Sequence, residues 1–182
     1  MISNAVSKGI EQGVNFLDTI VKAERALIDS GMPYTIMRPS WFFESLPLFV
    51  RRGRAMIIGK QRSEFRWLAA GDYARQLSTA LQTEAAANKC FYNLGPRKMS
   101  IKQALSDFCE RHYPDLKVEE VSLTKAKIAS KMPRLRKLKR SLPVFEYFSK
   151  VTEDVDPEEA DRILGPNRTT FDKWINGWEQ NA

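Results

Sequence analysis

Apolar residues recur near the start of the chain with the spacing of a helix followed by a strand. From residue 16 they return at steps of three and four, the period of one helical face, at Phe16, Ile20, Ala23 and Leu27. The charged residues of this stretch fall largely on the opposite side: Lys22, Glu24, Arg25 and Asp29. The pattern therefore predicts a surface helix that ends at Ser30 and Gly31, since glycine adopts the left-handed cap conformation at little cost.

Residues 34–37 are predicted to form a buried strand, because they are rich in β-formers and lie between Pro33 and Pro39. A helix joined by a tight turn to a short apolar strand is typical of a parallel α/β layer. Further strands or strand-like runs are predicted at residues 1–6, 55–58, 65–68, 90–94 and 116–121. Later helices are expected to begin at capping side chains: Asp72, Ser100, Ser122 and Thr170. The helix after Ser100 has one apolar face, made of Ile101, Ala104, Leu105, Phe108 and Cys109.

Composition narrows the class of protein. The chain has 182 residues, a net charge of +7 and a pI near 9.5, and its hydrophobic and charged contents are 43% and 28%, as in a globular protein in water. No run approaches the length of about eighteen apolar residues that a membrane span requires, and the N-terminus lacks the pattern of a signal peptide. Cys90 and Cys109 are too few for a disulfide framework or a zinc site. We therefore expect a reduced, cytoplasmic protein without a metal site.

Eight Lys and Arg residues fall within the sixteen positions 125–140: Lys125, Lys127, Lys131, Arg134, Arg136, Lys137, Lys139 and Arg140. Apolar residues are interleaved with them at helical spacing: Ile128, Met132, Leu135, Leu138 and Leu142. One interpretation is a helix, interrupted at Pro133, whose apolar residues pack while its charges are solvated. The alternative is a non-enzymatic interaction protein that uses the basic helix 125–140 to bind an anionic partner, which could be RNA, an acidic protein or an anionic membrane surface.

The ten residues from Ser30 to Pro39 carry the most specific motif of the chain. They read Ser-Gly-Met-Pro-Tyr-Thr-Ile-Met-Arg-Pro, which resembles a pattern of the NmrA-like branch of the atypical short-chain dehydrogenase/reductases: Ser-Gly, an apolar residue, then Tyr-Thr-Ile-apolar-Arg-Pro. Other pieces resemble parts of the same family in the same order, at residues 1–4, 21–27, 42–45, 65–74, 92–100 and 165–174. Within these pieces, Ser45 stands where the family usually has asparagine.

The resemblance implies an α/β fold: the C-terminal part of a Rossmann-like doubly wound parallel sheet, with a small α/β substrate lobe. The chain would then be a single α/β unit, with late Rossmann strands and helices in residues 1–83 and the substrate-side lobe and C-terminal helices in residues 84–182. The family binds NAD(P), and the residues that match its cofactor-binding positions are Ser3, Lys22, Pro39 and Ser40. The aromatic residues after the strand would contact a substrate, pack in the core or lie on surface left exposed by the missing half: Trp41, Phe42 and Phe43.

Two features of the family are absent from the sequence. None of the nine glycines falls into the G-x-x-G-x-x-G or G-x-G-x-x-G turn that holds the dinucleotide pyrophosphate at a helix N-terminus. Asp18 stands four residues before Lys22, where classical members have the acid–base tyrosine, and an ionised carboxylate cannot act as that phenol.

We therefore expect a truncated NAD(P)-binding oxidoreductase or dinucleotide-sensing protein, inactive as the isolated chain, that begins inside the fold. The loss of the first strands would leave an open sheet edge, to be covered by self-association or by a partner.

Overall fold

The computed structural model describes residues 1–9 and 11–178. The chain forms two compact units, each assembled from stretches that lie far apart in the sequence. Unit 1 comprises Met1–Glu44, Phe65–Lys98 and Glu153–Ala182, and unit 2 comprises Ser45–Glu64 and Met99–Thr152.

Unit 1 is built on parallel strands. Strand β1 (Thr35–Pro39) pairs in parallel with β5 (Lys89–Asn93), in a register that joins Met37 to Phe91. The N-terminal residues run parallel to β1 along its other side, where the N–H of Ser3 donates to the Met37 carbonyl at 2.7 Å. The spatial order is therefore residues 1–5, then β1, then β5, which confirms the predicted parallel α/β layer.

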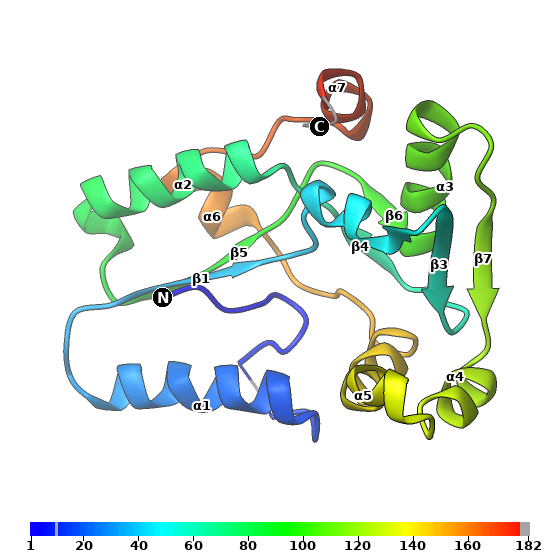
Figure 1. The fold of residues 1–182 in the computed structure, drawn as a ribbon. Helices are drawn as coiled ribbons and strands as arrows, with labels where there is room; N and C mark the ends of the chain where they lie inside the picture. Colours follow the sequence, from blue (N-terminus) through cyan, green and yellow to red (C-terminus); the bar gives the residue numbers. More distant parts are fainter. Residues whose placement is uncertain (10, 179–182) are drawn as a thin grey trace. The chain divides into compact units, whose positions relative to one another are not determined.

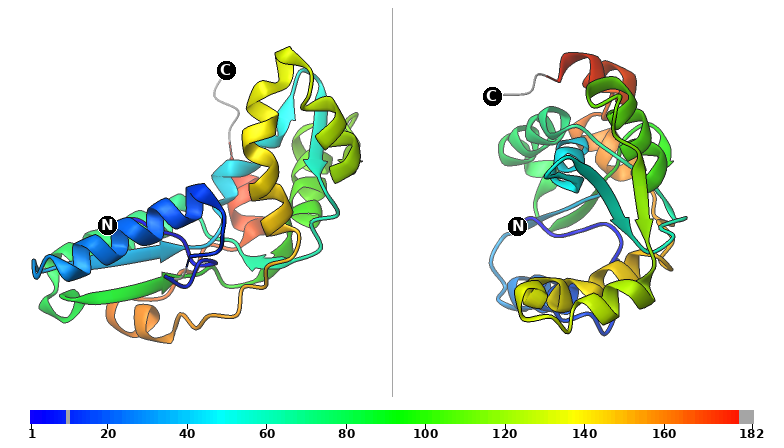
Figure 2. Two further views of the ribbon diagram at one scale, coloured as in Figure 1. Left: turned by 90° about the horizontal axis from the view of Figure 1, so that it is seen from below. Right: turned by 45° about the vertical axis from the view of Figure 1, so that its right-hand side comes forward.

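Helices cover both faces of these strands. Helix α1 (Asn15–Asp29) lies along one face, and α2 (Ala70–Gln82) and α6 (Glu158–Leu164) lie on the other (Figure 1). The two further views keep α1 and α2 on opposite sides of the strands (Figure 2). A short last helix, α7 (Phe171–Gly177), buries Phe171 and Trp174. This three-layer order is that of a doubly wound sheet, as the sequence predicted.

The buried face of α1 differs from the predicted one. The side chains that the helix buries are Leu17, Val21 and Glu24, whereas Phe16 is 63% exposed. The prediction that Glu24 faces solvent was therefore wrong. The physical reason is a partner 14 residues further along the chain, because Arg38 of β1 meets Glu24 in the interior, and a face defined by apolar residues alone cannot include a buried ion pair.

Unit 2 holds a second, smaller sheet. Strand β2 (Val50–Arg51) pairs antiparallel with β3 (Arg54–Ile58), which pairs in parallel with β7 (Val118–Val121). Helix α3 (Ile101–His112) packs on this sheet and buries all five residues of its predicted apolar face. The remaining helices of the unit are α4 (Leu123–Ala129) and α5 (Arg136–Phe148). Two short strands, β4 (Glu64–Arg66) and β6 (Lys98–Ser100), lie where the chain passes from one unit to the other.

Three of the four predicted helix caps are confirmed, and the fourth is wrong. The hydroxyls of Ser100, Ser122 and Thr170 accept from backbone N–H groups at the start of α3, α4 and α7, as expected. Asp72 does not cap α2, because that helix begins two residues earlier, at Ala70. Instead, Asp72 Oδ2 accepts from the N–H groups of Arg168 and Thr169, each at 2.7 Å. The carboxylate that serves the first turn of α2 belongs to Glu44, whose oxygens lie 3.1 Å from the Ala70 nitrogen.

Two features are absent from the described residues, 1–9 and 11–178. No helix in this part of the chain is long and apolar enough to cross a membrane. In the same part, no three His, Cys, Asp or Glu side chains gather in a way that could hold a metal ion.

Candidate functional site at the carboxyl end of the parallel strands

Three parallel segments of unit 1 end at the same edge of the sheet, which is where open α/β sheets bind their ligands. The N–H of Ala5 donates to the Pro39 carbonyl at 2.9 Å, and the N–H of Ser40 donates to the Asn93 carbonyl at 3.1 Å. These bonds align the ends of residues 1–5, β1 and β5. The candidate site consists of the side chains that follow or flank these three ends.

Ser3 has a buried hydroxyl that no described residue satisfies. The residue is 7% exposed, and its Oγ has no hydrogen-bond partner among the described atoms. Beside it, Pro39 lacks an N–H and cannot donate the return bond of the ladder to the Ser3 carbonyl. A buried hydroxyl without a partner costs free energy, so Ser3 is a group that a ligand at this edge could satisfy.

Ser40 and Glu153 form a buried pair directly after β1. The Ser40 hydroxyl donates to Glu153 Oε1, and the Arg66 N–H donates to Glu153 Oε2 at 2.6 Å. Burial of Glu153, which is 3% exposed, raises the pKa of its carboxyl above the ordinary range, although these two donors and the charges of Lys98 and Arg66 act in the opposite direction. No local pattern indicates this carboxylate, because 113 residues separate it from Ser40.

The three aromatic residues after β1 have different environments. Trp41 is half-buried, with its ring 5.5 Å from that of Trp67, and Phe42 is half-buried against Tyr73 at 5.3 Å. Phe43 is 2% exposed and lies 5.4 Å from the rings of Phe171 and Trp174. Of the alternatives left open by the sequence, Phe43 therefore follows the core interpretation, whereas Trp41 and Phe42 retain exposed surface. Burial raises the pKa of the Tyr73 phenol to about 12.

A close backbone approach fixes this aromatic cluster. Gly95 donates its N–H to the Arg66 carbonyl at 3.0 Å, and a Cβ at this position would lie 1.6 Å from the Trp67 carbonyl oxygen. Only glycine fits between these two stretches of backbone. The turn after β5 therefore positions Trp67, against which Trp41 packs.

Lys22 lies apart from the other predicted cofactor residues. Its side chain is 66% exposed, and its Nζ is 3.6 Å from Glu11 Oε2, a carboxylate that also pairs with Arg25. No described contact joins Lys22 to Ser3, Pro39 or Ser40. Asp18, four residues before Lys22, accepts from the Gln12 N–H at 2.6 Å and so ties down the loop before α1.

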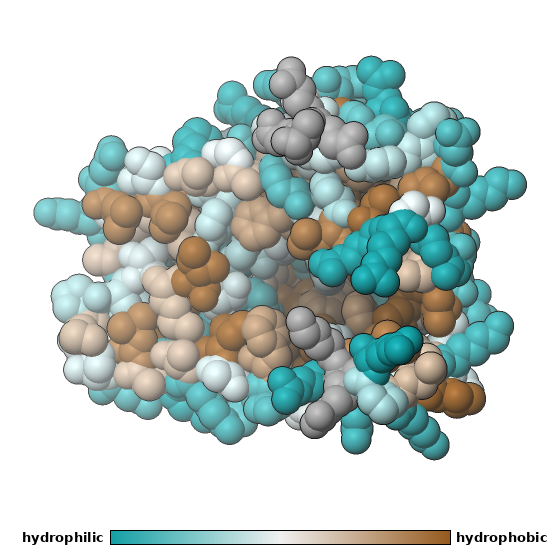
Figure 3. All heavy atoms as spheres, in the orientation of Figure 1, coloured by the Kyte–Doolittle hydropathy of each residue, from teal (hydrophilic) through white to brown (hydrophobic). Residues whose placement is uncertain are grey.

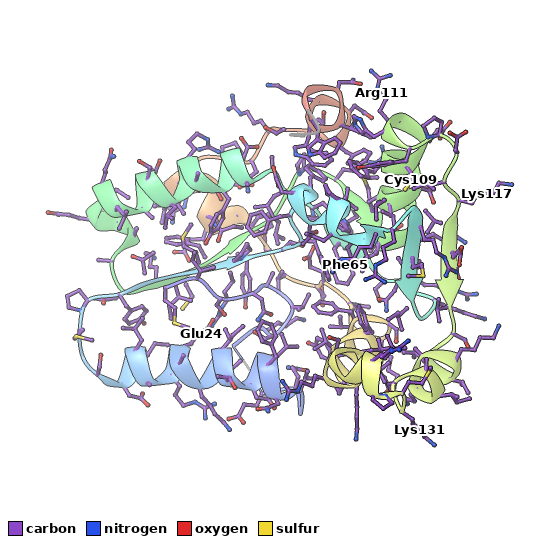
Figure 4. All side chains as sticks on the ribbon, viewed as in Figure 1. Glu24, Phe65, Cys109, Arg111, Lys117 and Lys131 are labelled. Carbon is purple, nitrogen blue, oxygen red and sulfur yellow. The ribbon has the colours of Figure 1, made fainter. Side chains whose placement is uncertain are left out.

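A buried ion pair under the strands was missed by the sequence reasoning. Arg38 donates from Nε to Glu24 Oε1 at 3.0 Å, from Nη2 to Glu24 Oε2 at 2.6 Å and from Nη1 to the Tyr92 hydroxyl at 3.1 Å. Burial acts to lower the pKa of Arg38, but the hydrogen bonds that Arg38 donates to Glu24 and the negative charge of Glu24 outweigh burial and raise that pKa. Figure 4 shows Glu24 on the side of α1 that faces the sheet. The signal available in the sequence was the spacing Leu17, Val21, Glu24, which places the glutamate on one helical face with two apolar residues.

Gly9 closes over this ion pair. Its φ is +70°, and an added Cβ would lie 2.4 Å from Arg38 Nη2. Both observations require glycine here. The loop after residues 1–5 is thus fitted to the Arg38 side chain, which couples the end of the first segment to β1.

No protein-family model matches this sequence, and no curated protein matches it. Solved structures do resemble it. The NADPH-dependent quinone oxidoreductase of Escherichia coli, solved with NADPH, aligns with a TM-score of 0.71 and 18% identity over 96% of this chain and 63% of its own. The Citrobacter triphenylmethane reductase, solved with NADP(H), aligns with a TM-score of 0.68 and 15% identity over 96% and 63%. A Staphylococcus aureus nucleoside-diphosphate-sugar epimerase aligns at 0.65 and 17% over 96% and 62%.

These likenesses define the fold class. The chain has the Rossmann-like α/β fold that the reductase and epimerase structures share. It spans less than two thirds of the length of each of these structures, so the matched region is a part of that fold.

Proposed function

We propose that this chain forms the nicotinamide and substrate side of an NmrA-like, NAD(P)-dependent oxidoreductase or dinucleotide-sensing protein. The observation that carries the proposal is the buried Ser3 hydroxyl, which has no hydrogen-bond partner among the described atoms and lies at the edge where three parallel segments end. The fold likeness to structures solved with NADPH and NADP(H) supports it.

In this proposal, one group of residues contacts the dinucleotide and another contacts the substrate. Ser3, Pro39 and Ser40 would hold the nicotinamide end of the dinucleotide, with the Ser3 hydroxyl hydrogen-bonding to it. Lys22 would reach the ribose only after release from Glu11, with which it is paired. Trp41 and Phe42 would contact the substrate, and Phe43 would support them from the core. A bound nicotinamide would supply or accept the hydride.

The phosphate end has no counterpart in this chain. The sequence contains no glycine-rich turn of the kind that cradles a pyrophosphate, and Asp18 replaces the acid–base tyrosine. The isolated chain should therefore bind whole dinucleotides weakly and should not catalyse hydride transfer. The NmrA-like resemblance covers both enzymes and sensors, and a sensor requires binding but no acid–base residue.

The outer edge of residues 1–5 fits the same proposal. Within the described part of the chain, no segment pairs with this edge, and Ile2 is 58% exposed there. Unpaired strand edges recruit other strands. A further parallel strand, supplied by a partner chain or by a second copy, would cover the edge and complete the sheet.

Calorimetric titration of the chain with NADPH and with NADH tests the proposal. We expect no saturation up to about 0.1 mM, because the groups that bind phosphate contribute much of a dinucleotide's affinity. Binding with a micromolar dissociation constant would show that the chain holds a complete site and would contradict this account.

A second candidate function is attachment to an anionic partner through residues 125–140. The observation that favours it is the division of charge between the units. The sequence of unit 2 contains seventeen Lys and Arg and seven Asp and Glu, whereas that of unit 1 contains twelve and fifteen. The positive charge of the chain therefore belongs to unit 2. Retention on a heparin column that falls steeply with salt, and is lost when Lys125, Lys131 and Arg134 are replaced by glutamate, would support this function.

A further inference from the structure

The turn between α4 and α5 exposes large apolar side chains among its basic residues. Ile128 is 63% exposed, Met132 57% and Leu135 39%. The expectation that the apolar residues of this region pack was wrong for these three, although Leu142 is buried. Pro133 ends the helical pattern, so the residues on either side of it do not form one continuous packed face.

Small side chains hold this segment to unit 2. Ala126 and Ser130 are buried, and the chain from residue 126 onward continues in short turns, with hydrogen bonds from Lys131 N to Ile128 O at 3.1 Å and from Leu135 N to Met132 O at 2.9 Å. The inward positions are thus small, and the outward positions carry the large apolar side chains. In a segment that packs in a protein core, the large apolar side chains would instead face inward.

Basic residues are interleaved in the sequence with the exposed apolar ones. Lys125, Lys131 and Arg134 are exposed, and the described residues offer them no carboxylate within ion-pair distance. Lys127 does have a partner, Glu146, at 3.1 Å. Figure 4 shows Lys131 at the end of unit 2 formed by α4. In the space-filling view, brown surface lies among teal at that end of the unit (Figure 3).

We propose that this segment, residues 125–135, attaches the protein to an anionic bilayer surface, with Ile128, Met132 and Leu135 entering the interface and the basic residues at the headgroups. The proposal rests on the second candidate function and names its partner. Five consecutive residues, 131–135, are all exposed, as expected of a projecting turn that meets a flat surface.

The basic residues indicate that the partner surface is negatively charged, and the exposed apolar residues indicate that it is a lipid bilayer. Basic side chains favour anionic lipid headgroups, but they would equally favour the phosphates of RNA. Exposed aliphatic side chains distinguish the two, because burial in the acyl boundary removes them from water, whereas a phosphate backbone offers them nothing. RNA-binding surfaces instead use aromatic rings or arginine planes for base stacking.

The test is co-sedimentation of the full chain with vesicles of pure phosphatidylcholine and with vesicles containing about one third phosphatidylglycerol, a fraction chosen to make the surface strongly anionic. We expect binding to the anionic vesicles alone. Added salt should weaken it, and K125Q/K131Q/R134Q should lower the partition by about fivefold per charge. I128S/M132S should also lower the partition at least tenfold, with the charge unchanged.

Two matched controls lie in unit 1. Leu81→Ser changes an apolar residue that is 81% exposed, and Lys173→Gln changes an exposed basic residue. Neither variant should change the partition.

Three outcomes would overturn the inference. If the chain binds single-stranded RNA or heparin but not anionic vesicles, the partner is not a bilayer. If I128S/M132S binds vesicles as well as the unchanged chain, the apolar residues do not enter the bilayer interface; in both of these cases only the lipid inference fails. If the chain binds none of these at low salt, the second candidate function fails with it.

Discussion

The carboxylate of Glu24 and the guanidinium of Arg38 form a two-point ion pair inside unit 1, with N–O distances of 2.6 and 3.0 Å. Their side chains are 3% and 11% exposed. Glu24 comes from α1 and Arg38 from β1, so the pair joins a helix to the strand that it covers. Arg38 lies in the Ser-Gly to Arg-Pro motif, and this geometry gives the arginine of that motif a structural role.

Replacing one member of the pair should destabilise the chain strongly. Glu24→Gln or Arg38→Met leaves an uncompensated charge in the interior, and such losses cost about 3–5 kcal/mol. Urea denaturation followed by circular dichroism measures the change in the free energy of unfolding.

The double variant E24L/R38M should recover most of the lost stability, because apolar residues can replace a buried ion pair with little net cost. Glu11→Gln, which removes exposed ion pairs, should cost less than about 1 kcal/mol. Single variants no less stable than Glu11→Gln would contradict the assignment.

The buried carboxyl of Glu153 should make stability depend on pH. Its pKa in the folded chain is raised by burial, so the folded state favours the protonated form. Its contribution to stability is therefore complete below the unfolded pKa and decreases as pH rises through the higher folded pKa. Relative to Glu153→Gln, the unchanged chain should lose stability as pH rises above the ordinary pKa of a glutamate carboxyl, 4.5. A gain over that range, measured as the difference in free energy of unfolding, would show that the pKa of Glu153 is lowered instead.

Gly95→Ala should be much more damaging than its conservative chemistry suggests. The added methyl group would meet the Trp67 carbonyl, and the backbone there cannot rotate away as a side chain could, so we expect a loss of at least about 3 kcal/mol. Gly71→Ala is the matched control, since nothing lies within 4 Å of a Cβ at this position in α2. It should raise stability by about 0.5–1 kcal/mol. Equal melting temperatures for the two variants would contradict the close approach at Gly95.

Asp72→Ala should loosen the turn before α7. Asp72 accepts from the N–H groups of Arg168 and Thr169, and removal of the acceptor should cost about 1–3 kcal/mol. Hydrogen exchange should show faster exchange of these two amides in the variant. The start of α2 should remain protected, because Glu44 supplies the acceptor there. If the amides at the start of α2 become labile instead, Asp72 is the helix cap that the sequence suggested.

Local sequence patterns predicted most helices and strands of this fold. They could not predict contacts between residues that lie far apart in the sequence. The face of α3, the stop at Gly31 and the caps at Ser100 and Thr170 depend on neighbours within a few residues, and all are confirmed. The burial of Glu24, the true partner of Asp72 and the position of Glu153 depend on residues 14, 96 and 113 positions away. No periodicity carries that information, although the spacing of Glu24 from Val21 was a usable hint.

Local patterns also predicted the location of the candidate site, but not the surroundings of its side chains. The motif ending at Pro39 located the carboxyl end of β1, and the parallel order of the strands is confirmed. The separate environments of Trp41, Phe42 and Phe43 could not be read from three consecutive aromatic letters, because they depend on where Trp67, Tyr73 and Trp174 lie. The assignments of Ser3, Lys22 and Ser40 to a cofactor stay predictions.

The central claim, that unit 1 keeps the nicotinamide side of a dinucleotide site without the phosphate side, can be tested by amide chemical-shift mapping with two half-ligands. Reduced nicotinamide mononucleotide should shift the amides of Ser3, Ser40 and Trp41 in a saturable way, and Ser3→Ala should weaken this binding while Ser78→Ala, on the exposed side of α2, should not. Adenosine 2′,5′-bisphosphate should shift nothing at this edge. Saturable shifts from the adenosine half alone, or none from the nicotinamide half, would contradict the account.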